Sequence, residues 1–231
     1  SLAFLVPDIR AQELVANYTF DGKASDFSDY GNHATVHGAR LTQDRFGVAN
    51  SALWFDGVPA WVTAPNAPQL QSPTTTVSFW VRADELPANG EVYLMSHGGW
   101  QERWKISLPA HGKTVWTTNH TNGISDMDSG DGNSLEVGVW THVVMVHDGN
   151  KDLIYFDGVL VASKDVVGDL NDTTYPLGIG YNPIDGGNYF KGAIDEVEIY
   201  DGALDATQIA SLYAAQASVP VYPPGVVAQY N

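Results

Sequence analysis

Two aspartates near opposite ends of the chain are the residues best placed to act together. Asp21 ends a strand-like segment at residues 14–22, and Asp195 lies in a similar segment at residues 192–200; each stands beside a glycine-bearing turn. Both segments alternate apolar and polar residues over the length of a half-buried strand. If the two strands are neighbours, the carboxylates can converge on one cation. The alternative is that they accept backbone hydrogen bonds in turns.

A second candidate group combines aromatic, amide and acidic side chains. Sugar rings present apolar C–H faces and hydroxyl edges, so aromatic faces beside amides and carboxylates can form a carbohydrate site. The candidate ligand-binding residues are Trp100, Trp104, His120, Tyr181, Asn182, Asp185 and Tyr189. The competing interpretation places tryptophans in the core. We expect that position for Trp54, Trp80 and Trp140, which lie in apolar runs.

Short strand-like segments, separated by Gly, Asn, Asp and Pro, must position these residues. Asp157-Gly158 predicts a two-residue hairpin turn. One helix is predicted at residues 206–215, capped by Asp205. Strands without intervening helices predict an all-β fold, an antiparallel two-sheet β-sandwich with one short C-terminal helix. Residues 1–13 are expected to be a lead-in segment, residues 14–216 the domain, and residues 217–231 a proline-rich tail or linker.

Composition restricts the partners. The 231 residues are 44% hydrophobic, enough for one large β domain, and 11 Lys and Arg against 27 Asp and Glu give a net charge of −16. Nucleic acids and anionic membranes select for basic surfaces, so neither is an expected partner. No apolar run approaches the roughly 20 residues of a membrane span. With no cysteine, disulfides and thiolate catalysis are excluded. The low Lys and Arg content disfavours charge-paired dimers, so we expect a monomeric domain.

Several segments in order resemble a laminin-G-like jelly roll of the concanavalin A-like lectin/glucanase superfamily. They are residues 18–22, 26–38, 46–57, 76–81, 140–143, 155–158, 177–180 and 193–201. The resemblance covers residues 14–216. It implies an extracellular domain, secreted or at a cell surface, and commonly one of several in a larger bacterial protein. Such domains bind glycans or proteins, or act as spacers, and many hold a structural calcium ion.

The resemblance also implies which residues hold that calcium. In the family, the acid after the first strand, an Asn-rich loop and the acid of the last strand share the ion. Asp21 and Asp195 match this pattern. Asp26 and Asn32 match it more loosely, since residues 29–30 depart from the usual small residues of the loop. Carboxylate and amide oxygens with turn carbonyls are the ligands that Ca²⁺ prefers.

We therefore predict a non-catalytic, calcium-stabilised carbohydrate-binding or adhesion module with a neutral glycan as ligand. The same fold hosts enzymes, and those of laminarinase type need the acid pattern E-x-D-x-E. Here Val197 lies between Glu196 and Glu198 and the third acid is missing, so we predict no catalytic residues. Two alternatives stay open. One is a glycoside hydrolase or polysaccharide lyase using carboxylates from Glu91, Glu102, Glu196 and Glu198. The other is a structural spacer or protein-binding domain.

Overall fold

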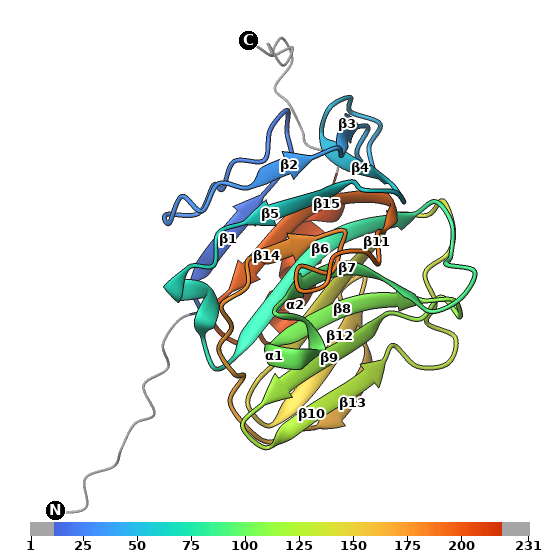
Figure 1. The fold of residues 1–231 in the computed structure, drawn as a ribbon. Coiled ribbons are helices and arrows are strands. Elements are labelled where there is room, and N and C mark those ends of the chain that lie inside the picture. The colour runs from blue at the N-terminus through green and yellow to red at the C-terminus, as the bar shows by residue number, and fades with distance from the viewer. Residues whose placement is uncertain (1–11, 219–231) are drawn as a thin grey trace, which may run out of the picture.

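Two antiparallel sheets packed face to face form the protein, as shown by a computed structural model that describes residues 12–218 (Figure 1). The predicted lead-in and tail lie almost entirely outside these residues. The eight-stranded sheet contains, in spatial order, β13 (Val159–Asp165), β12 (Lys151–Phe156), β11 (Thr141–His147), β6 (Thr75–Ala83), β15 (Lys191–Tyr200), β4 (Ala52–Asp56) and β3 (Arg40–Thr42), with β1 (Leu14–Tyr18) paired to β15. The predicted all-β sandwich is confirmed.

The seven-stranded sheet faces it across the core. Its order is β10 (Gly123–Asp128), β9 (Val115–His120), β8 (Trp104–Pro109), β7 (Glu91–His97), β14 (Leu177–Ile179), β5 (Trp61–Ala64) and β2 (Thr35–His37). Single turns of helix, η1 (Pro68–Gln71) and α1 (Gly99–Glu102), lie in its connections. Alternate residues of each strand point inward, as in a half-buried strand, and they build the core from side chains such as Phe79, Ile106, Trp116 and Val143.

The first and last strands of the domain are neighbours, as predicted. β1 pairs with β15 so that Tyr18 lies opposite Val197 and Asn17 opposite Glu198. The same edge of β15 pairs with β4 over its first four residues. Between the two partners β15 carries a bulge, where Glu196 has a φ of 47°. A bulge lets a strand change its pairing and its twist at one point.

Three local predictions have clear outcomes. Asp157-Gly158 joins β12 to β13 as a hairpin turn, with φ values of 49° and 78°. Asp205 caps α2 (Ala206–Ala217) by accepting the N–H groups of Thr207 and Gln208, and Gln208 completes the capping box. The core prediction was wrong for two tryptophans. Trp54 and Trp140 are half-buried, since the inward positions beside Trp54 belong to Leu53 and Phe55.

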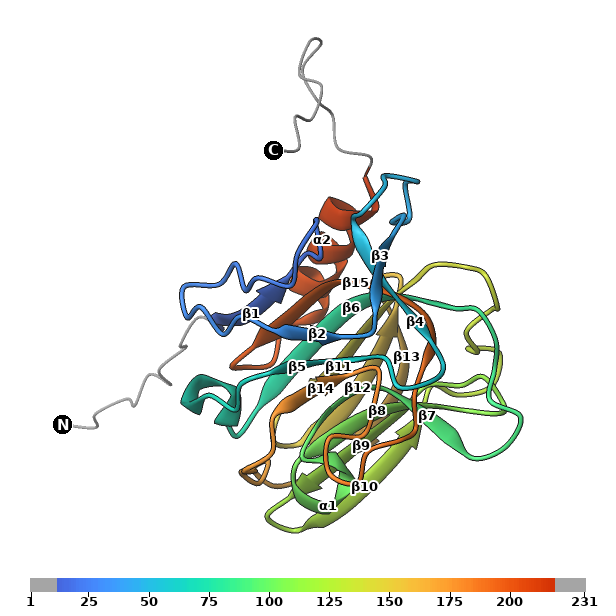
Figure 2. The ribbon, with the colours of Figure 1, turned by 45° about the horizontal axis from the view of Figure 1, so that its top comes forward.

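Helix α2 covers the outer face of the eight-stranded sheet (Figure 2). Ile209 of the helix and Leu204 before it pack on Val144, Val146 and Tyr155 as a second apolar cluster. Trp80, predicted for the core, is buried in this layer; its ring lies 5.9 Å from that of Tyr213. The apolar face of α2 is therefore positioned by the sheet, and not by the main core.

One arginine ties the bulge of β15 to this helix. Arg45 lies in the loop between β3 and β4, and its Nη1 donates to the Asp195 carboxylate at 2.9 Å. Its Nε and Nη2 donate to the carbonyl oxygen of Gln216 in α2, at 3.0 and 2.6 Å. The guanidinium also lies over the rings of Phe46 and Trp80, at 4.5 and 4.6 Å. A single buried cation thus joins a loop, a central strand and the C-terminal helix.

Replacing Arg45 with Met should lower the free energy of unfolding by about 3 kcal/mol, because it leaves the buried Asp195 carboxyl and the Gln216 carbonyl without their donor and removes the cation packed on two aromatic rings. Urea unfolding followed by tryptophan fluorescence measures the change. Arg40→Met, exposed in β3, is the control and should change stability by less than about 0.5 kcal/mol. An R45M protein as stable as wild type would contradict the role given to this cluster.

Candidate functional site

An exposed tryptophan on a one-turn helix marks the candidate site. Trp100 lies in α1 and keeps 47% of its surface exposed. Asn119 anchors the turn from below, donating to the carbonyl oxygens of Trp100 and Gln101 at 3.1 and 2.8 Å. Gly98 permits the tight approach, since a Cβ at that position would lie 2.4 Å from the Thr173 hydroxyl oxygen. The backbone of Trp100 is held while its ring faces solvent.

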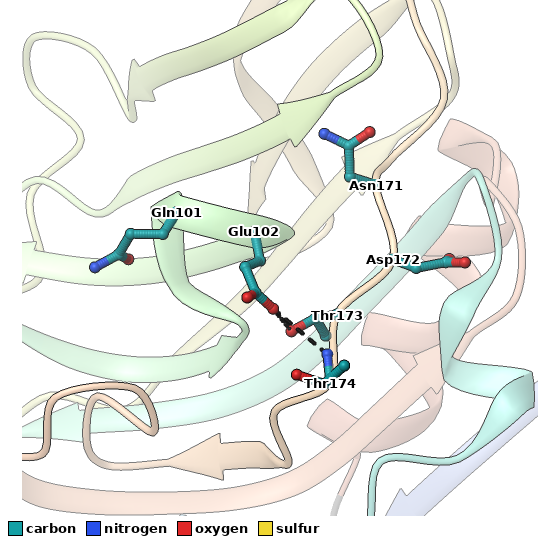
Figure 3. A pocket seen from close by; sticks show the side chains of 6 residues that line it. All are labelled: Gln101, Glu102, Asn171, Asp172, Thr173 and Thr174. Carbon is teal, nitrogen blue, oxygen red and sulfur yellow. Dashed lines mark hydrogen bonds between the residues drawn. The ribbon is translucent and has the colours of Figure 1, made fainter.

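Beside α1 lies an open pocket of about 390 Å³ (Figure 3). Its lining is polar and comes from the helix and from the segment before β14, namely Gln101, Glu102, Asn171, Asp172, Thr173 and Thr174. The Glu102 carboxylate accepts the Thr173 hydroxyl and the Thr174 N–H, which closes one side of the pocket (Figure 3). Amide, hydroxyl and carboxylate groups of this kind suit a polyhydroxylated ligand.

Buried polar contacts fix the wall of this pocket. Arg103, with a fully buried side chain, donates to the carbonyl oxygens of Asn171 and Ser72 at 2.7 and 2.6 Å. Burial lowers the pKa of Arg103 to about 10, so it stays charged at neutral pH. The Thr173 carbonyl oxygen accepts from Asn66 and Gln71. The segment at residues 171–174 is thus held before any ligand arrives.

The glycine-rich loop at residues 181–189 reaches α1 from the other side. Its Asp185 carboxylate accepts from the Gln101 amide at 3.4 Å. Asn182 shapes the loop by accepting the Ile184 N–H at 3.0 Å. Tyr181 lies over β14, where a Cβ on Gly178 would be 2.8 Å from its ring. The loop and the pocket therefore flank the same helix turn.

The structure separates the seven predicted ligand residues into three with open surface and four that are buried. Trp100 and Asp185 are exposed and Tyr189 is half-buried, whereas Tyr181 and Asn182 are buried and support the loop. The prediction was wrong for two residues that point inward. Trp104 is 1% exposed and packs on Trp116 at 5.6 Å, and His120 is 8% exposed and stacks on His147. Strand alternation places both on the core side of the sheet.

Sequence reasoning missed the pocket wall. The run at residues 171–174 consists only of hydrogen-bonding side chains between two strand signals, and that was the available clue. Its role depends on Arg103, Asn66 and Gln71, which lie 68 to 107 positions away along the chain. Contacts of that range leave no periodic pattern in a sequence.

The predicted calcium residues do not fit one oxygen cage. Both oxygens of Asp26 are occupied by protein donors: the N–H groups of Asn17, Ser28 and Asn32, and the Ser28 hydroxyl. Asp195 faces the Arg45 guanidinium. Among residues 12–218, no three His, Cys, Asp or Glu side chains are arranged to hold a metal ion. The family resemblance predicts a calcium ion at these residues, whereas the hydrogen bonds of Asp26 and Asp195 predict no stabilising ion there.

Three carboxylates gather instead around the bulge of β15. Burial, and next the charge of Glu196, raises the pKa of Asp195 to about 8, with Arg45 opposing the rise. Burial raises the pKa of Glu196 to about 7; Arg45 opposes this, and Glu198 and Asp21 add to it. Burial also raises the pKa of Glu198, which accepts from Tyr200 and Gln216. Asp21 thus acts electrostatically on Glu196.

The fold and site geometry define a lectin-like jelly roll. A family model described as the concanavalin A-like lectin/glucanases superfamily matches residues 56–210, and the chain belongs to this family. Its predicted membership is therefore confirmed. A comparison with curated protein sequences gives no match. No helix among residues 12–218 is both long and apolar enough to cross a membrane.

Solved structures with a similar fold include toxin binding domains and a domain of an arabinanase. The binding domain of botulinum neurotoxin serotype G is 19% identical with a TM-score of 0.72, over 89% of this chain and 52% of that domain. Domain 4 of AbnA, a GH43 extracellular arabinanase from Geobacillus stearothermophilus solved with arabinotriose, is 24% identical with a TM-score of 0.70, over 88% of this chain and all of that domain. The binding domain of botulinum neurotoxin DC, solved with SialylT, is 16% identical with a TM-score of 0.66, over 88% and 51%. This chain thus spans about half of the toxin binding domains.

The melting temperature should fall by about 2 to 4 °C between pH 6.5 and 8.5. The raised pKa values of Asp195 and Glu196 mean that the folded state holds protons which the unfolded state has released. That stabilisation is complete below the unfolded carboxyl pKa of about 4 and is lost as the pH rises through 7 to 8.

Burial lowers the pKa of His97 and His142 to about 3 and also lowers the pKa of His120, so protonation of these groups in the unfolded state reduces stability near and below pH 6.5. Above pH 6.5 the two buried histidines regain only about 0.4 kcal/mol each, which is less than the loss from the two carboxyls. Differential scanning calorimetry across the pH series is the measurement. Glu196→Gln should reduce the fall of the melting temperature with pH, because it removes one titrating group and its charge beside Asp195. A melting temperature that rises from pH 6.5 to 8.5 would contradict the assignment.

A chelator should leave the melting temperature unchanged within about 1 °C. A ligand stabilises a fold only through occupied sites, and the oxygens of Asp26 and Asp195 already face protein donors. Melting curves with calcium and with excess EDTA make the comparison, with magnesium as the control ion. A calcium-specific rise of several degrees would place the ion on other oxygens of the chain.

Proposed function

We propose that this protein is a non-catalytic carbohydrate-binding module that holds a neutral glycan against Trp100 and the adjoining pocket. The carrying observation is an exposed indole on the same helix turn as Gln101 and Glu102, which line a pocket of preorganised hydrogen-bonding groups. A sugar ring can lay its apolar face on the indole while its hydroxyls reach Gln101 and the residues 171–174. Preorganisation lowers the entropy cost of binding.

Charge supports a neutral ligand. The chain has a net charge of −16, and Glu102 and Asp172 line the pocket. Arg103 lies behind the pocket wall with a fully buried side chain, and it donates its hydrogen bonds to backbone carbonyl oxygens. An anionic polysaccharide would meet acidic groups without an accessible cation among the lining residues, and like charges in an interface are costly.

The distribution of glutamates supports binding over catalysis. Glycoside hydrolysis needs two carboxyl groups facing one groove at roughly 5 to 10 Å. Glu91 lies on the seven-stranded sheet and accepts from Lys105 and Ser107, and Glu102 lies in α1. Glu198 lies on the other sheet, bonded to α2 through Gln216. Glu196 lies beside Glu198 at the bulge of β15, but Glu196 faces Arg45 at 4.0 Å and Glu198 accepts from Tyr200 and Gln216. Neither acid lines the pocket beside α1, and we propose no reaction for the four glutamates.

The structural neighbours support sugar binding by this fold. One of them is a domain of an extracellular arabinanase solved with arabinotriose, and another is a toxin binding domain solved with SialylT. By analogy of fold, we propose that this domain also works outside the cell as one part of a larger protein. The glycan would tether the larger protein to its surface or substrate.

Trp100→Ala should weaken glycan binding about 30-fold, a loss of about 2 kcal/mol that is typical of a tryptophan at the centre of a contact. A neutral-glycan array that includes arabinotriose selects the ligand, and isothermal titration calorimetry measures its affinity. Trp140→Ala, which removes a half-buried indole beside Arg82 on the other sheet, is the matched control. A blank array for wild type, or equal affinity for W100A, would overturn the proposal.

A further inference from the structure

A cluster of aromatic rings lies on the outer face of the seven-stranded sheet, outside the Trp100 site. At its centre is Trp61 of β5, a half-buried residue whose neighbour Val62 points into the core. The Trp61 ring lies 4.9 Å from that of His37, 5.5 Å from Tyr181 and 6.0 Å from Tyr189. Core packing does not explain this cluster, because it lies on the opposite side of the sheet.

The other sheet shows how an outer aromatic layer is normally covered. There Trp80 and His142 contact Tyr213 of α2, and both are buried, at 5% and 0% exposure. Trp61 and Tyr189 instead keep part of their surface open in the described chain. The rings packed on Trp61 are His37 of β2 and two tyrosines of the loop at residues 181–189.

A second pocket continues from the cluster along β5. Thr63 lies two residues after Trp61, and its hydroxyl oxygen forms a hydrogen bond with His37 Nε2 at 3.2 Å. The pocket has a volume of about 270 Å³ and is lined by His33, Thr35, Thr63, Ala64, Pro65 and Pro176. None of these side chains is an acid, a lysine or an arginine. Open aromatic faces therefore adjoin hydroxyl and imidazole groups in an uncharged groove.

We propose that Trp61 and Tyr189, with the pocket at Thr63, form a second sugar subsite for the same neutral glycan. This inference rests on the proposed function. Uncharged lining selects a neutral ligand, the rings provide stacking faces, and Thr35 and Thr63 provide hydroxyl partners. A proline-rich peptide also docks in aromatic grooves, but the polar pocket beside the rings favours a polyhydroxylated chain.

The loop at residues 181–189 brings the two subsites within reach of one ligand. Asp185 contacts Gln101 beside Trp100, and Tyr189 contacts Trp61. Asp185 and Tyr189 are four positions apart along the chain, so their Cα atoms are at most about 14 Å apart. An oligosaccharide crossing the loop engages both subsites, and the second contact is then intramolecular. The protein thus selects long chains over short ones.

Calorimetry with arabinotriose, arabinohexaose, laminaritriose and laminarihexaose tests this reading. Wild type should bind one hexasaccharide at least 10-fold more tightly than the matching trisaccharide. Trp61→Ala and Tyr189→Ala should each remove that length dependence while leaving trisaccharide affinity within 2-fold. Trp100→Ala should weaken both lengths, and Trp140→Ala should change neither. Melting temperatures identify any variant that fails to fold, and Trp61→Phe should retain part of the gain.

Each outcome decides between the two proposals. Equal affinity for both lengths, or a length dependence that survives in W61A and Y189A, overturns the second subsite and leaves the Trp100 site standing. Failure of wild type to bind any of the four sugars overturns both. A decaproline peptide that binds wild type but not W61A, without a length dependence for sugars, assigns the groove to peptides and overturns the sugar subsite.

Discussion

The Arg45–Asp195 contact lies where the fold changes its strand pairing. β15 uses one edge to pair first with β4 and then with β1, and the bulge at Asp195 and Glu196 separates the two ladders. Such a break exposes polar groups to a dry interior, and a buried carboxylate without a partner is costly. Arg45 supplies the cation and links the bulge to α2. One guanidinium thus holds the sheet, the loop and the helix together.

The proposed binding surface lies on the other sheet, away from the Arg45 cluster. Helix α2 covers the outer face of the eight-stranded sheet, with Trp80 and His142 beneath the helix. The outer face of the seven-stranded sheet is covered in the described chain mainly by the loop at residues 181–189. Trp100 and Trp61 therefore keep part of their surface exposed on this sheet. In the proposed function, the covered sheet is the support and the open sheet holds the ligand.

Local patterns made much of the fold predictable. Alternating residues identified β1 and β15, Asp157-Gly158 identified a hairpin, and Asp205 identified the start of α2. The candidate site was predicted only in part. Trp100 and Trp104 are four residues apart and chemically identical, yet one is 47% exposed and the other 1%. A turn between strands exposes the first and a strand buries the second, so residue type alone could not separate them.

The sequence by itself determined the all-β class, the helix cap and the acidic character of the chain, whereas the pairing of the terminal strands was a hypothesis that the structure confirmed. These follow from period, capping chemistry and composition, which are properties of neighbouring residues. Only the tertiary structure decided which carboxylates meet. In the folded chain Asp26 accepts hydrogen bonds from backbone N–H groups, Asp195 pairs with Arg45, and Trp61 lies on the outer face of its sheet. Those partners are distant in sequence, and their contacts depend on how two twisted sheets pack, which no local pattern records.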